Sequence, residues 1–204
     1  MKGIPAVSAR AGGDGVVVGP LSFEGGSPIV PEGTLGFGEY QSGFRRGQPI
    51  LVVDAAGFAG GALEADVLKG LTARGKELWV STPVRDVGDL FDAFSTGMDY
   101  LVVPTHFVRG VDDLAEMHEV SDRVVPAVFA AGGRAPGGGS VESALLSARS
   151  VGFELAAVFD TDGSIPEWEW KRLLSSGIGI VPYAPEKWDW ETETCFLDAF
   201  RTFS

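Results

Sequence analysis

Short runs of consecutive apolar residues recur along the chain from residue 49 onward. Consecutive runs start 28, 22, 24, 31 and 23 residues apart, which is the length of one strand–loop–helix–loop unit. Nearly continuous apolar runs of this kind are typical of parallel strands that are buried on both faces of a sheet. The pattern therefore predicts repeated βα units, with strands that begin at Ile50, Leu78, Tyr100, Val124, Leu155 and Ile178.

The segments between these strands show the spacing of amphipathic helices. In the segment 87–94, apolar residues lie at i, i+3, i+4 and i+7, and Asp86 before them is a candidate N-cap. We expect further helices around Leu63–Leu71, from Ser140 to Ala148, and from Phe196 to Phe203. Each has one apolar stripe, as expected for helices that pack on a central sheet.

Residues 1–48 have a different pattern. Two short apolar runs, Ile4–Val7 and Val16–Val18, are separated by glycines and are candidate strands. The stretch 22–47 is rich in Gly and Pro and shows no helical period, and its aromatic residues favour an ordered loop. No linker separates this region from the rest, so we expect a single domain over residues 1–204, with an irregular strand and loop region over 1–48.

Repeated βα units limit the fold to an open doubly wound sheet or a closed barrel. No Gly-x-Gly-x-x-Gly follows a strand, so a dinucleotide site is not indicated. We expect an α/β fold of the TIM type, a small (β/α)8 barrel. Ile4–Val7 and the six later runs make only seven strands, so either Val16–Val18 completes the wall or the barrel is incomplete. A gap would leave an exposed edge for a partner chain or a loop to cover.

Composition and charge narrow the setting. Lys plus Arg is 16 and Asp plus Glu is 28, which gives a net charge of −12. An acidic surface repels phosphate backbones and anionic lipid, so nucleic-acid and membrane-surface roles are disfavoured. The single cysteine, Cys195, has apolar neighbours and fits core packing in a reducing cytoplasm. The sequence has no signal-peptide pattern and no apolar run of membrane-spanning length, which favours a soluble cytoplasmic protein.

The order of several segments resembles the barrels of histidine biosynthesis, a family that comprises the isomerase of a phosphoribosylformimino aminoimidazole ribotide and its sister cyclase. The segments that carry the resemblance lie at 4–7, 50–61, 78–90, 100–105 and 160–164, and it extends over roughly residues 1–185. Asp160-Thr161-Asp162-Gly163-Ser164 follows a strand and is similar to the family's Asp-x-Asp-Gly-Thr segment. The resemblance implies a (β/α)8 barrel that acts on a phosphorylated sugar derivative.

The chain departs from the family at the residues that carry the chemistry. The family closes its first and fifth strands with carboxylates that act as general acid and base, and the matching positions here hold Ser8 and Phe129. The family also binds phosphate at glycine-rich turns. Here Pro83 follows the third strand and Pro182 and Pro185 accompany the seventh, and proline offers no N–H donor. The family's own isomerase reaction is therefore not expected.

Polar residues that follow the predicted strands are candidates for a site at the mouth of a barrel. The candidates for acid–base catalysis are Asp54, His106, Asp160 and Asp162. The candidates for ligand binding are Ser8, Thr82, Arg85, Thr105, Ser164 and Tyr183. Residues in these positions are also ordinary helix caps and turn formers, so the structural reading stays open beside the functional one.

The sequence gives few indications of a bound metal or other cofactor. One cysteine and two separated histidines make no zinc site, so we expect no metal of that kind. Asp54, Asp160 and Asp162 together could offer oxygen ligands to Mg²⁺, which is the one cofactor that the residues suggest.

Two functions remain open. The first is a divergent isomerase-like protein, without the family's catalytic carboxylates, that binds or converts a small metabolite, with a phosphorylated sugar among the candidates; if it is active, it is an isomerase or lyase. The alternative is a catalytically silent relative that acts through oligomer or partner contacts. Tryptophans at 168, 170, 188 and 190 alternate with acidic residues and are candidates for a homodimer contact.

Overall fold

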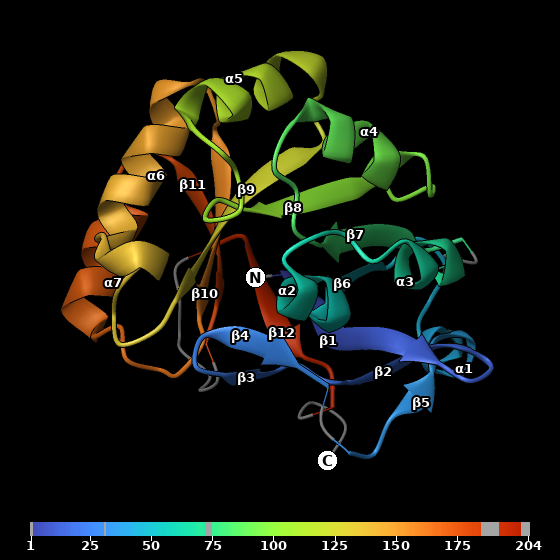
Figure 1. Cartoon of the computed structure of the whole chain (residues 1–204). Coiled ribbons are helices and arrows are strands. Elements are labelled where there is room, and N and C mark those ends of the chain that lie inside the picture. The colour runs from blue at the N-terminus through green and yellow to red at the C-terminus, as the bar shows by residue number, and fades with distance from the viewer. Residues whose placement is uncertain (1, 31, 72–74, 185–191, 201–204) are drawn as a thin grey trace.

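The structure is a computed structural model that describes residues 2–30, 32–71, 75–184 and 192–200. Ten strands form one sheet and two more form a separate small sheet (Figure 1). The strands are β1 (Lys2–Gly12), β2 (Gly15–Pro20), β3 (Ser22–Glu24), β4 (Ser27–Ile29), β5 (Leu35–Gly36), β6 (Pro49–Asp54), β7 (Glu77–Ser81), β8 (Tyr100–Pro104), β9 (Val124–Ala130), β10 (Leu155–Asp160), β11 (Gly179–Tyr183) and β12 (Thr194–Asp198). The helices are α1 (Phe37–Ser42), α2 (Ala55–Gly60), α3 (Ala65–Gly70), α4 (Val87–Phe94), α5 (Val111–Val120), η1 (Pro136–Gly138), α6 (Val141–Ser150) and α7 (Glu167–Leu174).

The six apolar runs predicted as strands are confirmed, and they form β6 to β11 in sequence order. Each pairs in parallel with the next, so their carboxyl ends lie at one edge of the sheet. β1 pairs with β6 along one side. Along its other side its first half pairs in parallel with β12 and its second half pairs antiparallel with β2. The long β1 therefore joins the parallel strands to the antiparallel extension of β2 and β5.

The prediction of a (β/α)8 barrel is wrong. The sheet is mixed, because β2 and β5 are antiparallel, and it is not closed, because no ladder joins β11 to β12 among the described residues. A cavity of about 450 Å³ opens at the amino ends of β1, β7, β10, β11 and β12, lined by residues such as Ile4, Ile180 and Thr194. The run Val16–Val18 does not complete a wall, since it lies in β2. Repeated βα units are compatible with open and closed sheets alike, so the repeat could not decide closure.

The prediction of a last helix from Phe196 to Phe203 is also wrong where the structure describes it. Residues Thr194–Asp198 form β12, which pairs in register with β1, with Phe196 opposite Ile4. A short apolar run fits a strand as well as one turn of helix, and pairing with an available strand edge decided between them. The region 22–47 is ordered, as expected, although it contains the short helix α1 that the sequence pattern did not predict.

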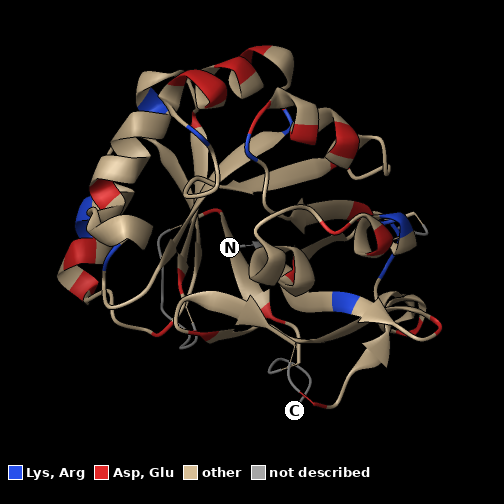
Figure 2. Ribbon diagram, viewed as in Figure 1, with Lys and Arg blue, Asp and Glu red and all other residues tan. Residues whose placement is uncertain are grey.

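Side chains of the sheet alternate between two clusters. Val52, Val80 and Val158 lie in an outer cluster with the apolar sides of the helices. Leu51, Trp79 and other residues lie in an inner cluster on the concave side of the sheet. Figure 1 shows α4 to α7 along the outer side of the curled sheet. Figure 2 shows the charged positions mainly on the helices and loops of that side, where water solvates them.

The loops at the carboxyl ends of the strands are held by capping side chains. Asp86 accepts a hydrogen bond from the Asp89 N–H, 3.1 Å away, and begins α4 as predicted. Ser140 caps α6 in the same way, through the Ser143 N–H. The helix expected around Leu63–Leu71 is shorter, since α3 begins at Ala65 and ends at Gly70. None of the helices in the described ranges is long and apolar enough to cross a membrane.

Candidate functional site

Two buried serines on the inner face of the sheet have no hydrogen-bond partner. Ser8 ends the series Ile4, Ala6 and Ser8 along β1, and Ser81 follows Trp79 by two residues on β7, so both face the inner cluster. In register, Ser8 lies opposite Val53, and Val53 lies opposite Ser81. Both residues are 0% exposed, and neither Oγ has a partner among the described residues. The two hydroxyls therefore lie at one level, separated by β6.

Aromatic rings cluster on the same inner face of the sheet as these hydroxyls. Phe129 stacks on Phe159 with ring centroids 4.3 Å apart, and Phe159 stacks on Phe196 at 5.3 Å. The ring of Phe58, from α2, meets the ring of Phe129 edge-on at 4.9 Å. Phe23, from β3, lies 6.1 Å from Phe129, measured between ring centroids. The inner face is therefore apolar and aromatic apart from the serines.

His106 lies at the rim of this aromatic region, in the loop after β8. Its ring centroid is 4.3 Å from that of Phe107, 6.2 Å from that of Phe58 and 6.3 Å from that of Phe129. The His106 side chain is exposed at this rim, and its partial desolvation by the neighbouring rings lowers its pKa from the ordinary value of 6.5. The imidazole is therefore neutral at pH 7, and one of its nitrogens can donate a hydrogen bond while the other accepts one.

Asp54 is a buried loop-organising carboxylate. It caps α2 by accepting the Gly57 N–H at 2.9 Å, and it also accepts the Glu64 N–H at 3.1 Å and the Thr82 hydroxyl at 2.8 Å. Burial raises the pKa of Asp54, against the lowering effect of the hydrogen bonds from Gly57, Thr82 and Glu64. A Cβ at Gly57 would lie 2.2 Å from Oδ2 of Asp54, so only glycine fits there. These contacts give Asp54 and Thr82 a shared structural role, which is to hold the loops after β6 and β7 in place.

Asp160 and Asp162 organise the loop after β10. Asp160 accepts the Ser164 N–H at 3.0 Å and the Ile165 N–H at 3.1 Å. Burial raises the pKa of Asp160 to about 6. Asp162 accepts the Gly132 N–H at 2.8 Å and the Ser164 hydroxyl, so it joins this loop to the loop after β9.

The contacts of Asp162 have a chemical consequence for ligands. The N–H groups of Gly132 and Ser164 are the kind of donors that bind phosphate in other proteins, but here the Asp162 carboxylate already occupies them. Hydrogen bonding to Ser164 and Gly132 holds the pKa of Asp162 below its ordinary value despite partial burial, so the carboxylate is charged at neutral pH. This loop pair therefore presents a negative charge to solvent.

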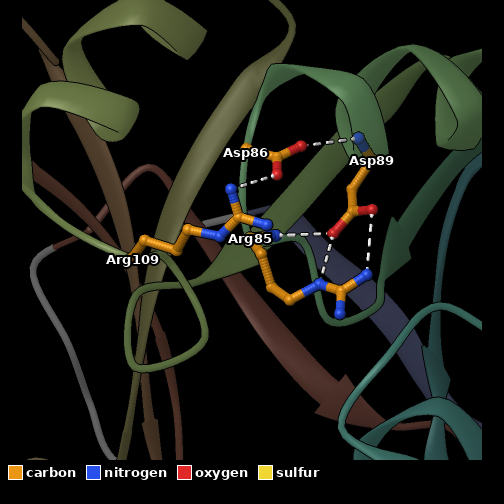
Figure 3. Close-up of polar contacts among 4 residues, drawn as sticks. All are labelled: Arg85, Asp86, Asp89 and Arg109. Carbon is orange, nitrogen blue, oxygen red and sulfur yellow. Dashed lines mark hydrogen bonds and ion pairs between the residues drawn. The ribbon is translucent and has the colours of Figure 1, made fainter.

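Arg85 and a neighbouring loop are held by two ion pairs. Arg85 Nε lies 2.8 Å from Asp89 Oδ2, and Arg109 Nη1 lies 2.9 Å from Asp86 Oδ2 (Figure 3). The Arg109 N–H also donates to the Arg85 carbonyl, at 3.2 Å. The ion pair with Arg85 lowers the pKa of Asp89. Both guanidinium groups thus have carboxylate partners, and they tie the loops after β7 and β8 together.

The remaining predicted residues have local partners. Thr105 donates its hydroxyl to the Ala127 carbonyl at 3.2 Å, and Tyr183 donates its hydroxyl to the Leu21 carbonyl at 3.2 Å. Trp170 is buried in the helical layer, whereas Trp168 is 63% exposed beside Arg172. Trp188 and Trp190, the other two tryptophans of the predicted dimer contact, lie outside the described residues.

Asp54 lies apart from the other two predicted carboxylates, whereas Asp160 and Asp162 lie together and both accept the Ser164 N–H. Asp54 ends β6 and Asp160 ends β10, and β7, β8 and β9 lie between them in the sheet. Within the described ranges, no group of three or more His, Cys, Asp or Glu side chains is arranged to hold a metal ion. The oxygens of Asp54 and Asp160 accept hydrogen bonds from N–H groups of their own loops, and a Mg²⁺ site stays a prediction.

Of the predicted residues, His106 and Tyr183 lie among aromatic residues that the sequence analysis had not selected, and Ser8 faces the same inner side of the sheet. Phe23, Phe58 and Phe129 are the main additions. Phe23 belongs to a region with no regular pattern, and its position over the sheet depends on a long-range contact. The alternation of Ala6 and Ser8 along β1 was the available signal for an inward hydroxyl.

Comparison with models of known protein families finds no match, and a search among curated proteins finds no similar sequence. The resemblance to the histidine-biosynthesis enzymes therefore stays a prediction.

Proposed function

We propose that this protein binds a small uncharged molecule with a flat ring, at the carboxyl end of the inner face of the sheet. The observation that carries the proposal is the pair of buried, unpartnered hydroxyls of Ser8 and Ser81. A buried hydroxyl without a partner costs about 1–3 kcal/mol. A ligand that completes both hydrogen bonds would recover that free energy, and the aromatic rings beside them would contact its apolar faces.

The spacing of the hydroxyls limits the size of the ligand. Ser8 and Ser81 are separated by two strand intervals, about 10 Å. Two hydrogen bonds of about 2.8 Å leave about 4 Å between the polar atoms of a bridging ligand. Two substituents in a 1,3 relation on a six-membered ring have this separation, as in uracil or resorcinol. His106 at the rim offers a further neutral donor or acceptor.

The charges near the site favour an uncharged ligand over a phosphorylated one. Arg85 and Arg109 are in ion pairs with carboxylates, and Asp162 occupies the loop N–H groups that would suit an anion. Arg134 is exposed on the loop after β9 and lies in the same loop pair as the charged Asp162. The net charge of −12 adds long-range repulsion of anions.

The proposal is one of binding rather than of carboxylate catalysis. General acid–base chemistry needs groups that are free to exchange protons with a substrate. Each oxygen of Asp54 and Asp160 instead already accepts a hydrogen bond from an N–H group of its own loop. The residues Ser8 and Phe129, which stand where the resembled family has its carboxylates, support the same reading.

Thermal-shift measurements with named probes test this function. Uracil and resorcinol are the uncharged ring probes, and ribose 5-phosphate is the phosphorylated probe. A probe with a Kd of about 1 mM, present at about 10 mM, stabilises the folded state by about 1.4 kcal/mol. For a chain of this length that corresponds to a rise of about 3–5 °C in Tm. We expect this rise with a ring probe and none with ribose 5-phosphate.

Variants connect the binding to the two hydroxyls. In Ser8→Ala/Ser81→Ala the rise should vanish, whereas Ser147→Ala, a serine exposed on α6, should keep it. The proposal is overturned if neither ring probe raises Tm, or if the double variant responds as the unchanged protein does. Stabilisation by ribose 5-phosphate alone would contradict the ligand class.

A further inference from the structure

We infer that the hairpin of β3 and β4, residues 22–29, is a displaceable plug that closes this site in the free protein and moves away to admit a ligand. The purpose of the motion rests on the proposed function. The motion itself can be measured without a ligand.

The hairpin is not part of the main sheet. β3 and β4 pair only with each other, over three residues each, with Ser22 opposite Ile29. A two-stranded hairpin of this length is at best marginally stable by itself. Its position therefore depends on contacts of its side chains with the rest of the protein, and no backbone ladder has to break when it moves.

The hairpin packs against α2 through β4 and against the candidate site through Phe23. The Phe23 ring lies 5.7 Å from the Tyr183 ring and 6.1 Å from the Phe129 ring, measured between centroids. The Tyr183 hydroxyl donates to the Leu21 carbonyl at the start of the hairpin, at 3.2 Å. At the hairpin turn, Gly26 lies against Ala131. Figure 1 shows the hairpin between α2 and β10, in front of β12.

Phe23 explains why displacement by a ligand would be favourable. Its ring packs on Phe129 and Tyr183 and so makes the aromatic contacts that a ligand ring would otherwise make. A phenyl ring has no hydrogen-bonding group, so the plug leaves the hydroxyls of Ser8 and Ser81 unpartnered. A ligand with a ring and two polar atoms would replace the aromatic contacts and supply the missing hydrogen bonds.

The chain around the hairpin allows it to move as a unit. Pro20 ends β2 immediately before Leu21, and Gly33 after the hairpin has a φ of +87°. A glycine at positive φ can take up large backbone changes that other residues cannot. Within the hairpin, Gly25 and Gly26 form a tight turn at positive φ, so the two strands stay paired.

Thiol labelling measures the opening directly. In Ser81→Cys, the introduced thiol lies on the inner face of the sheet, whose aromatic cluster Phe23 of the hairpin packs against, and native Cys195 on β12 is 3% exposed and reports opening of the rest of the sheet. The protein is treated with methyl methanethiosulfonate, and the two sites are followed by mass spectrometry of peptides. We expect the thiol at position 81 to react at least ten times faster than Cys195. Equal rates would overturn the inference, because position 81 would then be reached only by unfolding of the sheet.

Two further variants test which contacts hold the plug. Tyr183→Phe removes the hydrogen bond to Leu21 and should raise the ratio of the two labelling rates by about two- to ten-fold. Phe23→Ala removes the aromatic contacts and should raise the ratio further. The ratio is used because it cancels any general loss of stability. An unchanged ratio in both variants contradicts the inference. Ser8→Cys repeats the measurement from the other hydroxyl if Ser81→Cys does not fold.

A disulfide provides the opposite perturbation. A Cβ built at Gly26 lies 3.1 Å from the Cβ of Ala131, so a small shift of the turn brings the pair into the range of a disulfide. Cysteine at Gly26, whose φ is +84°, is strained, but the oxidised and reduced forms share that strain, so their comparison cancels it. In Gly26→Cys/Ala131→Cys/Ser81→Cys, oxidation should slow labelling at position 81 to the rate of Cys195, and reduction should restore it. Fast labelling in the oxidised protein would show that entry does not pass the hairpin.

The two proposals fail separately. If position 81 is labelled fast, the disulfide slows this labelling, and no probe raises Tm, then the displacement of the hairpin is supported and the proposed ligand class is wrong. A rise in Tm that depends on Ser8 and Ser81, with equal labelling rates, would leave the binding site standing and remove the plug.

Discussion

Ser81 and Thr82 are consecutive, both are 0% exposed, and the structure predicts opposite effects when their hydroxyls are removed. The Ser81 hydroxyl has no partner within the described part of the chain, so Ser81→Ala removes a buried polar group that costs about 1–3 kcal/mol. Part of this gain in the free energy of unfolding is offset, because the removed oxygen leaves a small cavity. We expect the free energy of unfolding to rise by about 1 kcal/mol, and Ser8→Ala to behave alike.

Thr82→Val is the matched control. The two side chains have nearly the same shape, but valine cannot donate the 2.8 Å hydrogen bond to the buried carboxylate of Asp54. A hydrogen bond to a charged group contributes about 1.5–3 kcal/mol, so the free energy of unfolding should fall by that amount. Neighbouring substitutions should therefore differ by about 3 kcal/mol, with opposite signs.

Urea unfolding at pH 7, followed by tryptophan fluorescence and by circular dichroism, measures both changes. Coincident transitions with unchanged slopes would justify a two-state treatment. A loss of 1 kcal/mol or more in Ser81→Ala would refute the reasoning, because it would mean that the hydroxyl has a favourable partner. The binding proposal would then be contradicted as well, because it rests on the unpartnered hydroxyls of Ser8 and Ser81.

Three other predictions concern stability and titration. Burial raises the pKa of Asp160 from 3.8 to about 6, so the folded state binds the proton of this carboxyl more tightly than the unfolded state does. The resulting contribution to the free energy of unfolding is fully present below pH 3.8. About 3 kcal/mol is lost as the pH rises through 6. Urea unfolding of Asp160→Asn should lack this contribution, and a difference from the unchanged protein that is the same at pH 3.5 and pH 7 would contradict it. Asp86→Ala loses the cap of α4 and the ion pair with the exposed Arg109, so the free energy of unfolding should fall by about 1–2 kcal/mol. Almost all of this loss should come from the cap, so Arg109→Ala alone should lower the free energy of unfolding much less. Phe58→Ala opens the surroundings of His106 to water, so the pKa of that imidazole should rise toward 6.5 in an NMR titration; a further fall would refute the assigned cause.

The sequence by itself determined the elements that depend on local pattern. The six apolar runs became β6 to β11, because parallel strands buried on both faces need apolar residues throughout. Asp86 and Ser140 became caps, because a capping oxygen needs only the N–H groups of the next turn. The inward direction of Ser8 also followed from the period of two along its strand.

Only the tertiary structure decided what depends on distant pairing. Residues 194–198 have an apolar spacing that also suits a helix, and they became β12 because one side of β1 was available to pair with them. Closure of the sheet depended on β11 and β12 meeting in register, which no local pattern encodes. The roles of Asp54 and Asp160 were decided by N–H groups three to ten residues away in folded loops, and Phe23 reached the inner face through contacts with residues more than 100 positions later. Local patterns fix which backbone conformations are favourable, whereas these contacts exist only once the chain has folded.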